Sequence, residues 1–212
     1  MSTDGAGRPS TPIDLDLPFR GRWITRNSPA DRVPSHGTSL FATAYSIDLV
    51  PVDDRGRTAP IGLSTLVGPE AAGRFPGFGR TLLAPVDGVV VAVHDGLPDH
   101  PAYRGLPSIG YALTQRSRMR GGWVALAGNH VLIDAGDAVV ALCHLRRGSV
   151  TVGRGRRVRA GEPIGQCGNS GNSVEPHLHL QAMTDHRVEH AHPVRLTLRG
   201  SLPRNGEIID AG

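Results

Sequence analysis

Glycine and proline interrupt this sequence so often that long helices have little room. The chain of 212 residues contains 28 glycines and 17 prolines, and the apolar runs between them are short. Short apolar runs bounded by turn residues are typical of β-strands. No stretch carries a convincing amphipathic-helix period. The pattern therefore predicts an all-β fold, with short antiparallel strands in a single domain that forms a distorted barrel or sandwich.

Turn signals between the apolar runs predict two hairpins. Residues 81–96 carry Asp87-Gly88 between two β-rich halves, and Asp-Gly is a strong hairpin signal. A second hairpin is expected with arms over 129–134 and 138–145, and the pattern is β-rich from Trp123 onward. Residues 55–80 and 97–122 show no sustained period, although the second stretch has room for a short helix. We expect these two stretches to be long loops around a functional groove.

Composition shifts at the two ends suggest boundaries for the domain. Residues 1–22 begin with a polar segment rich in proline, glycine and aspartate, which predicts a loose N-terminal arm. The folded domain is then expected over 23–200, followed by a C-terminal tail over 201–212.

The charge pattern argues against a nucleic-acid-binding protein. The formal net charge is +4, and every basic residue is an arginine. This balance is compatible with an anionic partner such as a cell-wall polymer. No dense basic run with interleaved aromatic residues occurs, so no nucleic-acid partner is expected. The arginine-rich segment 154–159 is interpreted as the solvated edge of a hairpin.

Export and membrane signals are absent from the sequence pattern. The first twenty residues hold no apolar run typical of a signal peptide, and no apolar stretch reaches about 18 residues. We therefore expect no membrane span. The two cysteines, Cys143 and Cys167, are too few for a disulfide framework. They either form one bridge or are buried as apolar residues, and the oligomeric state stays open.

The segment His177-Leu178-His179-Leu180 has the alternation of a strand with two imidazoles on one face. Residues i and i+2 of a strand point the same way, so the leucines would face a core. Imidazole is a common zinc ligand and the usual acid–base group near neutral pH. Upstream, Ile47 and Leu49 flank Asp48 in a second alternating run, which places the carboxylate opposite the apolar face. Taken alone, each pattern also fits a solvent-facing strand.

Four pieces of the chain, in order, resemble the LytM/lysostaphin-type zinc endopeptidases of family M23. They are APVDGVVVAV, GNHVLIDAG, AVVALCHLRRGSVTVGRGRRVRAGEPIGQCGNSG and PHLHLQ, which together span residues 84–181. The ordered set is specific, although no single piece is decisive.

The resemblance implies a metal site and two catalytic histidines. His179 corresponds to the zinc-binding histidine of the H-x-H pair, while His177 and His144 correspond to catalytic residues that do not bind the metal. The family's remaining ligands are normally spaced H-x-x-x-D, and Asp48 matches the aspartate. Ala44 stands where the histidine is usual, so our hypothesis is that His36 supplies that ligand across an expanded loop. His36, Asp48 and His179 would then hold one Zn²⁺, with a position left for water.

The implied function is zinc-dependent hydrolysis of peptide bonds in peptidoglycan stem or cross-bridge peptides, or in another peptide. Zinc would activate the attacking water, and His144 and His177 would assist. Gly165, Gly168 and Gly171 would suit a groove that a peptide backbone approaches closely.

Two other functions are weighed against this one. The first is a non-catalytic LytM-like domain with a degenerate metal site that binds or regulates a cell-wall partner. The second is a sugar-phosphotransferase carrier domain, against which the ordered M23 pieces and the H-L-H spacing argue. The location also stays open, because the family's usual substrate lies in the cell wall and no signal peptide is visible.

Overall fold

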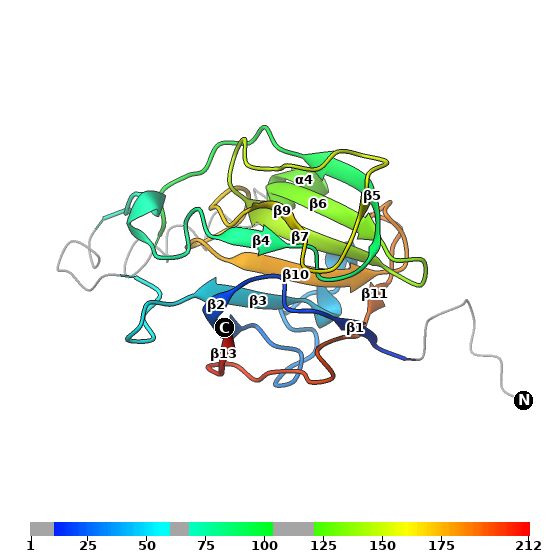
Figure 1. The fold of residues 1–212 in the computed structure, drawn as a ribbon, viewed down its shortest axis with the longest axis horizontal. Coiled ribbons are helices and arrows are strands. Elements are labelled where there is room, and N and C mark those ends of the chain that lie inside the picture. The colour runs from blue at the N-terminus through cyan, green and yellow to red at the C-terminus, as the bar shows by residue number, and fades with distance from the viewer. Residues whose placement is uncertain (1–10, 60–67, 104–120) are drawn as a thin grey trace, which may run out of the picture.

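A computed structural model describes residues 11–59, 68–103 and 121–212, and its centre is one antiparallel sheet (Figure 1). Among the described residues this sheet has nine strands, eight of them in the order β13-β2-β3-β10-β7-β6-β5-β8, with β11 beside β10. Their bounds are β13 (Ile208–Ala211), β2 (Gly21–Arg26), β3 (Ile47–Pro51), β10 (Leu178–Met183), β7 (Val139–Leu145), β6 (Asn129–Asp134), β5 (Gly88–His94), β8 (Arg157–Val158) and β11 (Pro193–Val194). The all-β prediction is confirmed, but the described sheet is open and does not close into a barrel.

Two small sheets and three short helical segments complete the described fold. Strand β1 (Ile13–Leu15) pairs in parallel with β12 (Leu196–Leu198), an exception to the expected antiparallel pairing, and β4 (Thr81–Leu83) pairs with β9 (Pro163–Gln166). The helical segments are η1 (Leu40–Tyr45), η2 (Ala72–Arg74) and α4 (Gly122–Ala127). None of the described helices is long and apolar enough to cross a membrane.

The apolar run after Gly122 is helical, whereas the sequence pattern predicts a strand there. Trp123 and Ala127 are four residues apart and both buried, so a single helical turn brings them to the same side of α4. Gly128 ends the helix with a φ of 67°. The run is too short for its period to distinguish a strand from a helix.

One predicted hairpin is confirmed and the other is wrong. β6 and β7 form the expected pair across the turn at Gly136. Asp87-Gly88 is not a hairpin turn, because β4 pairs with β9 while β5 pairs with β6 and β8. The Asp87 carboxylate instead accepts a hydrogen bond from the Ala160 N–H at 2.8 Å. Gly88 has no room for a Cβ atom beside the Asp134 carbonyl, so close strand packing requires this glycine.

Both ends of the described chain are packed, which corrects the expectation of a loose arm and a tail for these residues. Residues 1–10 lie outside the described part, but β1 follows directly, and Leu15 and Phe19 are each 1% exposed in the main core. At the other end, β13 pairs with β2 as the outermost strand of the sheet. The apolar alternation in these two strands is only three to four residues long, too short to stand out in the sequence.

The two faces of the sheet pack against two different apolar clusters. On one face, Leu178 and Leu180 of β10 pack with the leucines and valines of the main core, as the alternation predicts. On the other face, a smaller apolar cluster includes Cys143 and Met183 and is covered by Trp123 of α4 and Ala42 of η1. His179 and Gln181 alternate with the leucines of β10, so they lie on this second face.

Candidate metal centre

Three neighbouring strands bring the centre of the site together. β10 lies between β3 and β7, and His179 is directly opposite Asp48 on one side and Cys143 on the other. Side chains of directly opposite residues share a face and lie close together. The prediction that Asp48 points away from the core beside His179 therefore agrees with the structure.

His144 reaches the same face because of a β-bulge in β7. Asn129 pairs with Leu145 and Val131 with Leu142, so Cys143 and His144 together stand opposite a single residue of β6. His144 has a φ of 63°, which is uncommon for a residue other than glycine. Simple alternation would turn its ring toward the leucine core. The bulge instead places that ring 4.7 Å from the His177 ring and 5.8 Å from the His179 ring, centroid to centroid.

His36 joins the site from a loop, as the hypothesis of an expanded connection requires. The segment between His36 and Asp48 contains η1, and the His36 ring returns to the carboxylate, with Nε2 3.0 Å from Oδ2 of Asp48. His179 Nδ1 lies 2.9 Å from Oδ1 of the same carboxylate. The candidate ligand atoms of His36, Asp48 and His179 all lie within 4.8 Å of one another, which is compact enough for a metal ion.

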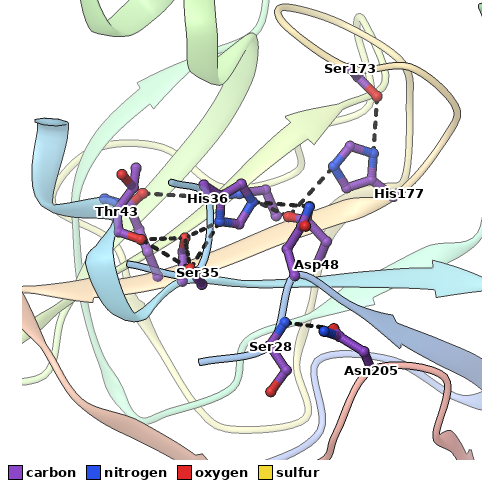
Figure 2. Close-up of polar contacts among 12 residues, drawn as sticks. Ser28, Ser35, His36, Thr43, Asp48, Ser173, His177 and Asn205 are labelled. Carbon is purple, nitrogen blue, oxygen red and sulfur yellow. Dashed lines mark hydrogen bonds and ion pairs between the residues drawn. The ribbon is translucent and has the colours of Figure 1, made fainter. Parts of the chain in front are cut away.

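His177 lies beside this trio. Its Nε2 atom is 3.6 Å from Oδ1 of Asp48, and Figure 2 shows His36 and His177 approaching the carboxylate from two sides. The predicted orientation of His177 and His179 toward one face agrees with the structure.

The partners of the outer ring nitrogens indicate which nitrogen of each histidine carries hydrogen. His144 Nδ1 faces the Ser170 carbonyl at 2.9 Å, and His177 Nδ1 faces the Glu175 carbonyl at 2.8 Å. A carbonyl only accepts, so both rings carry hydrogen on Nδ1 and keep a lone pair on Nε2.

The Ser46 hydroxyl likewise indicates which nitrogen of His36 carries hydrogen. The Ser46 hydroxyl donates to the Thr43 carbonyl at 2.7 Å and lies 2.9 Å from His36 Nδ1, so toward the ring it is an acceptor (Figure 2 shows the neighbouring Ser35 and Thr43). A neutral His36 with hydrogen on Nδ1 would therefore turn its Nε2 lone pair toward Asp48, whereas a protonated ring donates to the carboxylate from Nε2.

Burial and charge shift the protonation equilibria of the site. Burial alone would raise the pKa of Asp48, but the charges of His36 and His177 and the hydrogen bonds from His179 and His36 hold that pKa well below its usual range. Burial lowers the pKa of His179, and burial together with the charges of His177 and His179 lowers the pKa of His144 well below its usual value. For His36, burial is outweighed by the charge and hydrogen bond of Asp48, so its pKa is raised. Asp48 is thus ionised and His144 neutral at pH 7.

The hydrogen-bond partners of the two imidazoles show whether His36, Asp48 and His179 fit a cation. His179 has an acceptor at each nitrogen, namely the Asp48 carboxylate and the side-chain oxygen of Gln181 at 3.0 Å. His36 likewise lies between Asp48 and an accepting serine hydroxyl. A neutral imidazole has one N–H, so it cannot satisfy two acceptors. A cation among the inward nitrogens and the carboxylate would satisfy both rings at once, and imidazole with carboxylate is a donor set that zinc accepts.

Several residues that support the site are absent from the sequence predictions. Asn27 donates to Oδ2 of Asp48 at 2.7 Å, Ser46 orients His36, and Gln181 contacts His179. The Ser173 hydroxyl lies 3.0 Å from His177 Nδ1. Of these, Gln181 has a usable sequence signal, because it follows His179 by two residues and so shares its strand face.

The glycines near the site allow close packing within the chain itself. A Cβ atom on Gly168 would meet the backbone of Arg146, and one on Gly171 would meet the backbone of Gly128. Asn169 is also structural, since its side-chain amide donates to the His100 carbonyl at 2.8 Å. Cys143 and Cys167 are free, buried thiols, and burial raises the pKa of both. The alternative of a bridge between them is therefore not realised.

Comparison with known proteins finds a similarity to one peptidase family over part of the chain. Residues 117–192 match the sequence model of peptidase family M23. The peptidoglycan DD-endopeptidase ShyA of Vibrio cholerae is 31% identical over 78 residues, which are 37% of this chain and 18% of ShyA. The chain thus matches less than a fifth of that relative's length.

Two solved structures are similar to this chain at low sequence identity. The catalytic domain of lysostaphin from Staphylococcus simulans is 18% identical with a TM-score of 0.40, and the superposition covers 70% of this chain and 74% of that domain. A zinc-containing peptidase from Vibrio cholerae is 16% identical with a TM-score of 0.37, covering 70% of this chain and 48% of that one.

Proposed function

Given that residues 117–192 are a segment of peptidase family M23, we propose that this chain is a zinc-dependent endopeptidase that acts on peptidoglycan peptides. The observation that carries the proposal is the convergence of His36, Asp48 and His179 on one small volume, with His144 and His177 beside it. His36 and Asp48 lie outside the matched segment, so their arrangement is independent support.

The three candidate ligands would be Nε2 of His36, the Asp48 carboxylate and Nδ1 of His179. Two neutral imidazoles and one ionised carboxylate are a ligand set found in catalytic zinc sites, which usually keep one position for water or substrate. Zinc bound there would lower the pKa of water and polarise the scissile carbonyl.

His144 and His177 would handle the proton. Each holds its Nδ1 hydrogen on a backbone carbonyl, which leaves the Nε2 lone pair available as a base. Burial keeps His144 neutral, so it can accept a proton from the attacking water and pass it to the leaving amine. Once protonated, either ring can donate to the oxyanion of the tetrahedral intermediate.

A non-catalytic role is the second candidate, and one observation favours it. Ala44 occupies the position where the family's H-x-x-x-D spacing places a metal ligand. If His36 does not substitute for that ligand, the domain would bind a cell-wall partner without hydrolysing it.

Metal analysis distinguishes the two candidates. We expect about one zinc per chain in the parent protein and none after His36→Ala or His179→Ala. His190→Ala is a matched control, because His190 is exposed and no hydrogen bond of its side chain is seen in the described chain. Full zinc retention by His36→Ala would remove His36 from the ligand set.

Hydrolysis of purified peptidoglycan then tests catalysis. His144→Ala and His177→Ala should keep their zinc but lose at least about a hundredfold in rate, since general acid–base groups contribute on that order. A parent protein that holds zinc yet releases no peptide fragments would favour the non-catalytic role.

A further inference from the structure

We propose that Gln181 is a positioning residue that holds the His179 ring with hydrogen on Nε2, so that Nδ1 is the atom available to a metal. The inference rests on the proposed zinc site. It concerns a side chain that is completely buried, with 0% of its surface exposed, on the same face of β10 as His179.

The orientation of the Gln181 amide follows from its contact with η1. Its nitrogen lies 2.9 Å from the Phe41 carbonyl oxygen, which can only accept a hydrogen bond. The NH₂ group must therefore face Phe41, and the amide oxygen faces His179. An amide rotated by 180° would set two oxygens against each other.

The amide oxygen then determines the state of the His179 ring. It lies 3.0 Å from Nε2 and can only accept, so it stabilises the ring form with hydrogen on Nε2. That form carries its lone pair on Nδ1, 2.9 Å from the Asp48 carboxylate and next to the His36 ring. A hydrogen bond on the outer nitrogen of a ligating histidine fixes its orientation and strengthens it as a ligand.

The backbone at the far end of this chain of contacts is strained. Phe41 and Ala42 have φ values of 55° and 61°, in a region that residues other than glycine rarely adopt. Such strain persists where surrounding structure holds it in place, often beside functional sites. The carbonyl of the strained residue Phe41 is the one that accepts the hydrogen bond from the Gln181 amide.

Zinc affinity tests the role of Gln181 without an activity assay. We expect Gln181→Leu, which removes the acceptor, to weaken zinc binding about 10- to 100-fold in a chelator-competition titration. Gln181→Glu restores an acceptor beside Nε2, so it should bind zinc more tightly than Gln181→Leu, even though its second oxygen faces the Phe41 carbonyl and must be protonated to keep that bond. Gln166→Leu is the control, since Gln166 lies on β9 and contacts Arg146 instead of the site.

The ring nitrogens supply a readout that a purely structural role would not move. In the zinc-loaded parent, ¹⁵N chemical shifts should report a metal-bound Nδ1 and a hydrogen-bearing Nε2 for His179, with that hydrogen protected from solvent exchange. Gln181→Leu should lose the protection, and Gln181→Glu should keep it.

The possible outcomes separate the two proposals. A parent protein that binds no zinc would overturn the proposed function together with this inference. A parent that binds zinc, alongside a Gln181→Leu variant of equal affinity and equal Nε2–H protection, would overturn only the role of Gln181. If the leucine variant does not fold, Gln181→Asn, whose shorter side chain withdraws the acceptor, replaces it in the comparison with Gln181→Glu.

Discussion

Four histidine side chains differ in the ring nitrogen that they present to the site, because different atoms contact their outer nitrogens. His144, His177 and His36 each present Nε2 to the site, because a carbonyl or an accepting hydroxyl takes the Nδ1 hydrogen. His179 is reversed and presents Nδ1. The two-residue spacing of His177 and His179 predicts a shared face, but it cannot predict this difference. The contacts come from segments that are distant in the sequence.

Asn27 gives a first test at this scale. Its side-chain nitrogen donates to Oδ2 of Asp48 at 2.7 Å, and its φ of 47° lies in the left-handed region. Asn27→Gly removes the amide while the backbone keeps a conformation that glycine adopts easily. We expect zinc affinity to fall about tenfold or more, because the Asp48 carboxylate loses the bond that orients it. Equal affinities in a chelator-competition titration would contradict this role.

His144 makes the stability of the metal-free protein depend on pH. Burial and the neighbouring histidines lower the pKa of His144, whereas an unfolded chain takes up this proton near pH 6.5. Below about pH 6.5 the unfolded state therefore binds more protons, and the free energy of unfolding falls as the pH falls. The contribution of one group is at most about 1.4 kcal/mol per pH unit.

Comparison with His144→Gln isolates this contribution from that of the other titrating groups. The free energy of unfolding in urea, measured with a chelator at pH 7.5 and 5.5, should decrease more for the parent than for the variant. Parallel decreases in the two proteins would show that His144 takes up its proton equally well in the folded state.

At the scale of elements, strand runs were predictable where the sequence alternates, but their pairing was not. The runs that form β6, β7 and β10 all appear in the sequence pattern, and so does the β6–β7 turn. The bulge that turns His144 toward the site depends on which residues pair across β6 and β7. The turn predicted at Asp87-Gly88 was wrong because both residues serve contacts with distant segments. Asp87 accepts a hydrogen bond from Ala160, and Gly88 packs closely against Asp134.

The loop after β9 is held by a close approach that only glycine permits. A Cβ atom at position 168 would overlap the backbone of Arg146, and backbone cannot move aside as a flexible side chain can. Gly168→Ala should therefore destabilise the protein by about 1–3 kcal/mol. Gly153→Ala is the matched control, because nothing lies within 4 Å of its added Cβ atom, and its effect should be within about 1 kcal/mol. Urea unfolding of both variants provides the comparison.

At the scale of the whole molecule, the predicted boundaries were too narrow. The sheet that carries Asp48 and His179 is extended by β2 and then by β13, a strand from the predicted tail. At the N-terminal end of the described chain, β1 lies within the predicted arm and pairs with β12. The end strands β1 and β13 escaped prediction because they have only three and four residues, and their partners lie far away in sequence.

Leucine truncation measures whether the N-terminal strand belongs to the folded unit. Leu15 is 1% exposed within the main core, and truncating such a leucine to alanine typically costs about 2–5 kcal/mol. Leu40 is 53% exposed, so the same truncation there should change stability by less than about 0.5 kcal/mol. We therefore expect Leu15→Ala to lower the urea midpoint strongly and Leu40→Ala to leave it nearly unchanged. Equal, small effects at both positions would mean that residues 13–15 form a detachable arm. The domain would then begin at β2, as the composition of the sequence predicts.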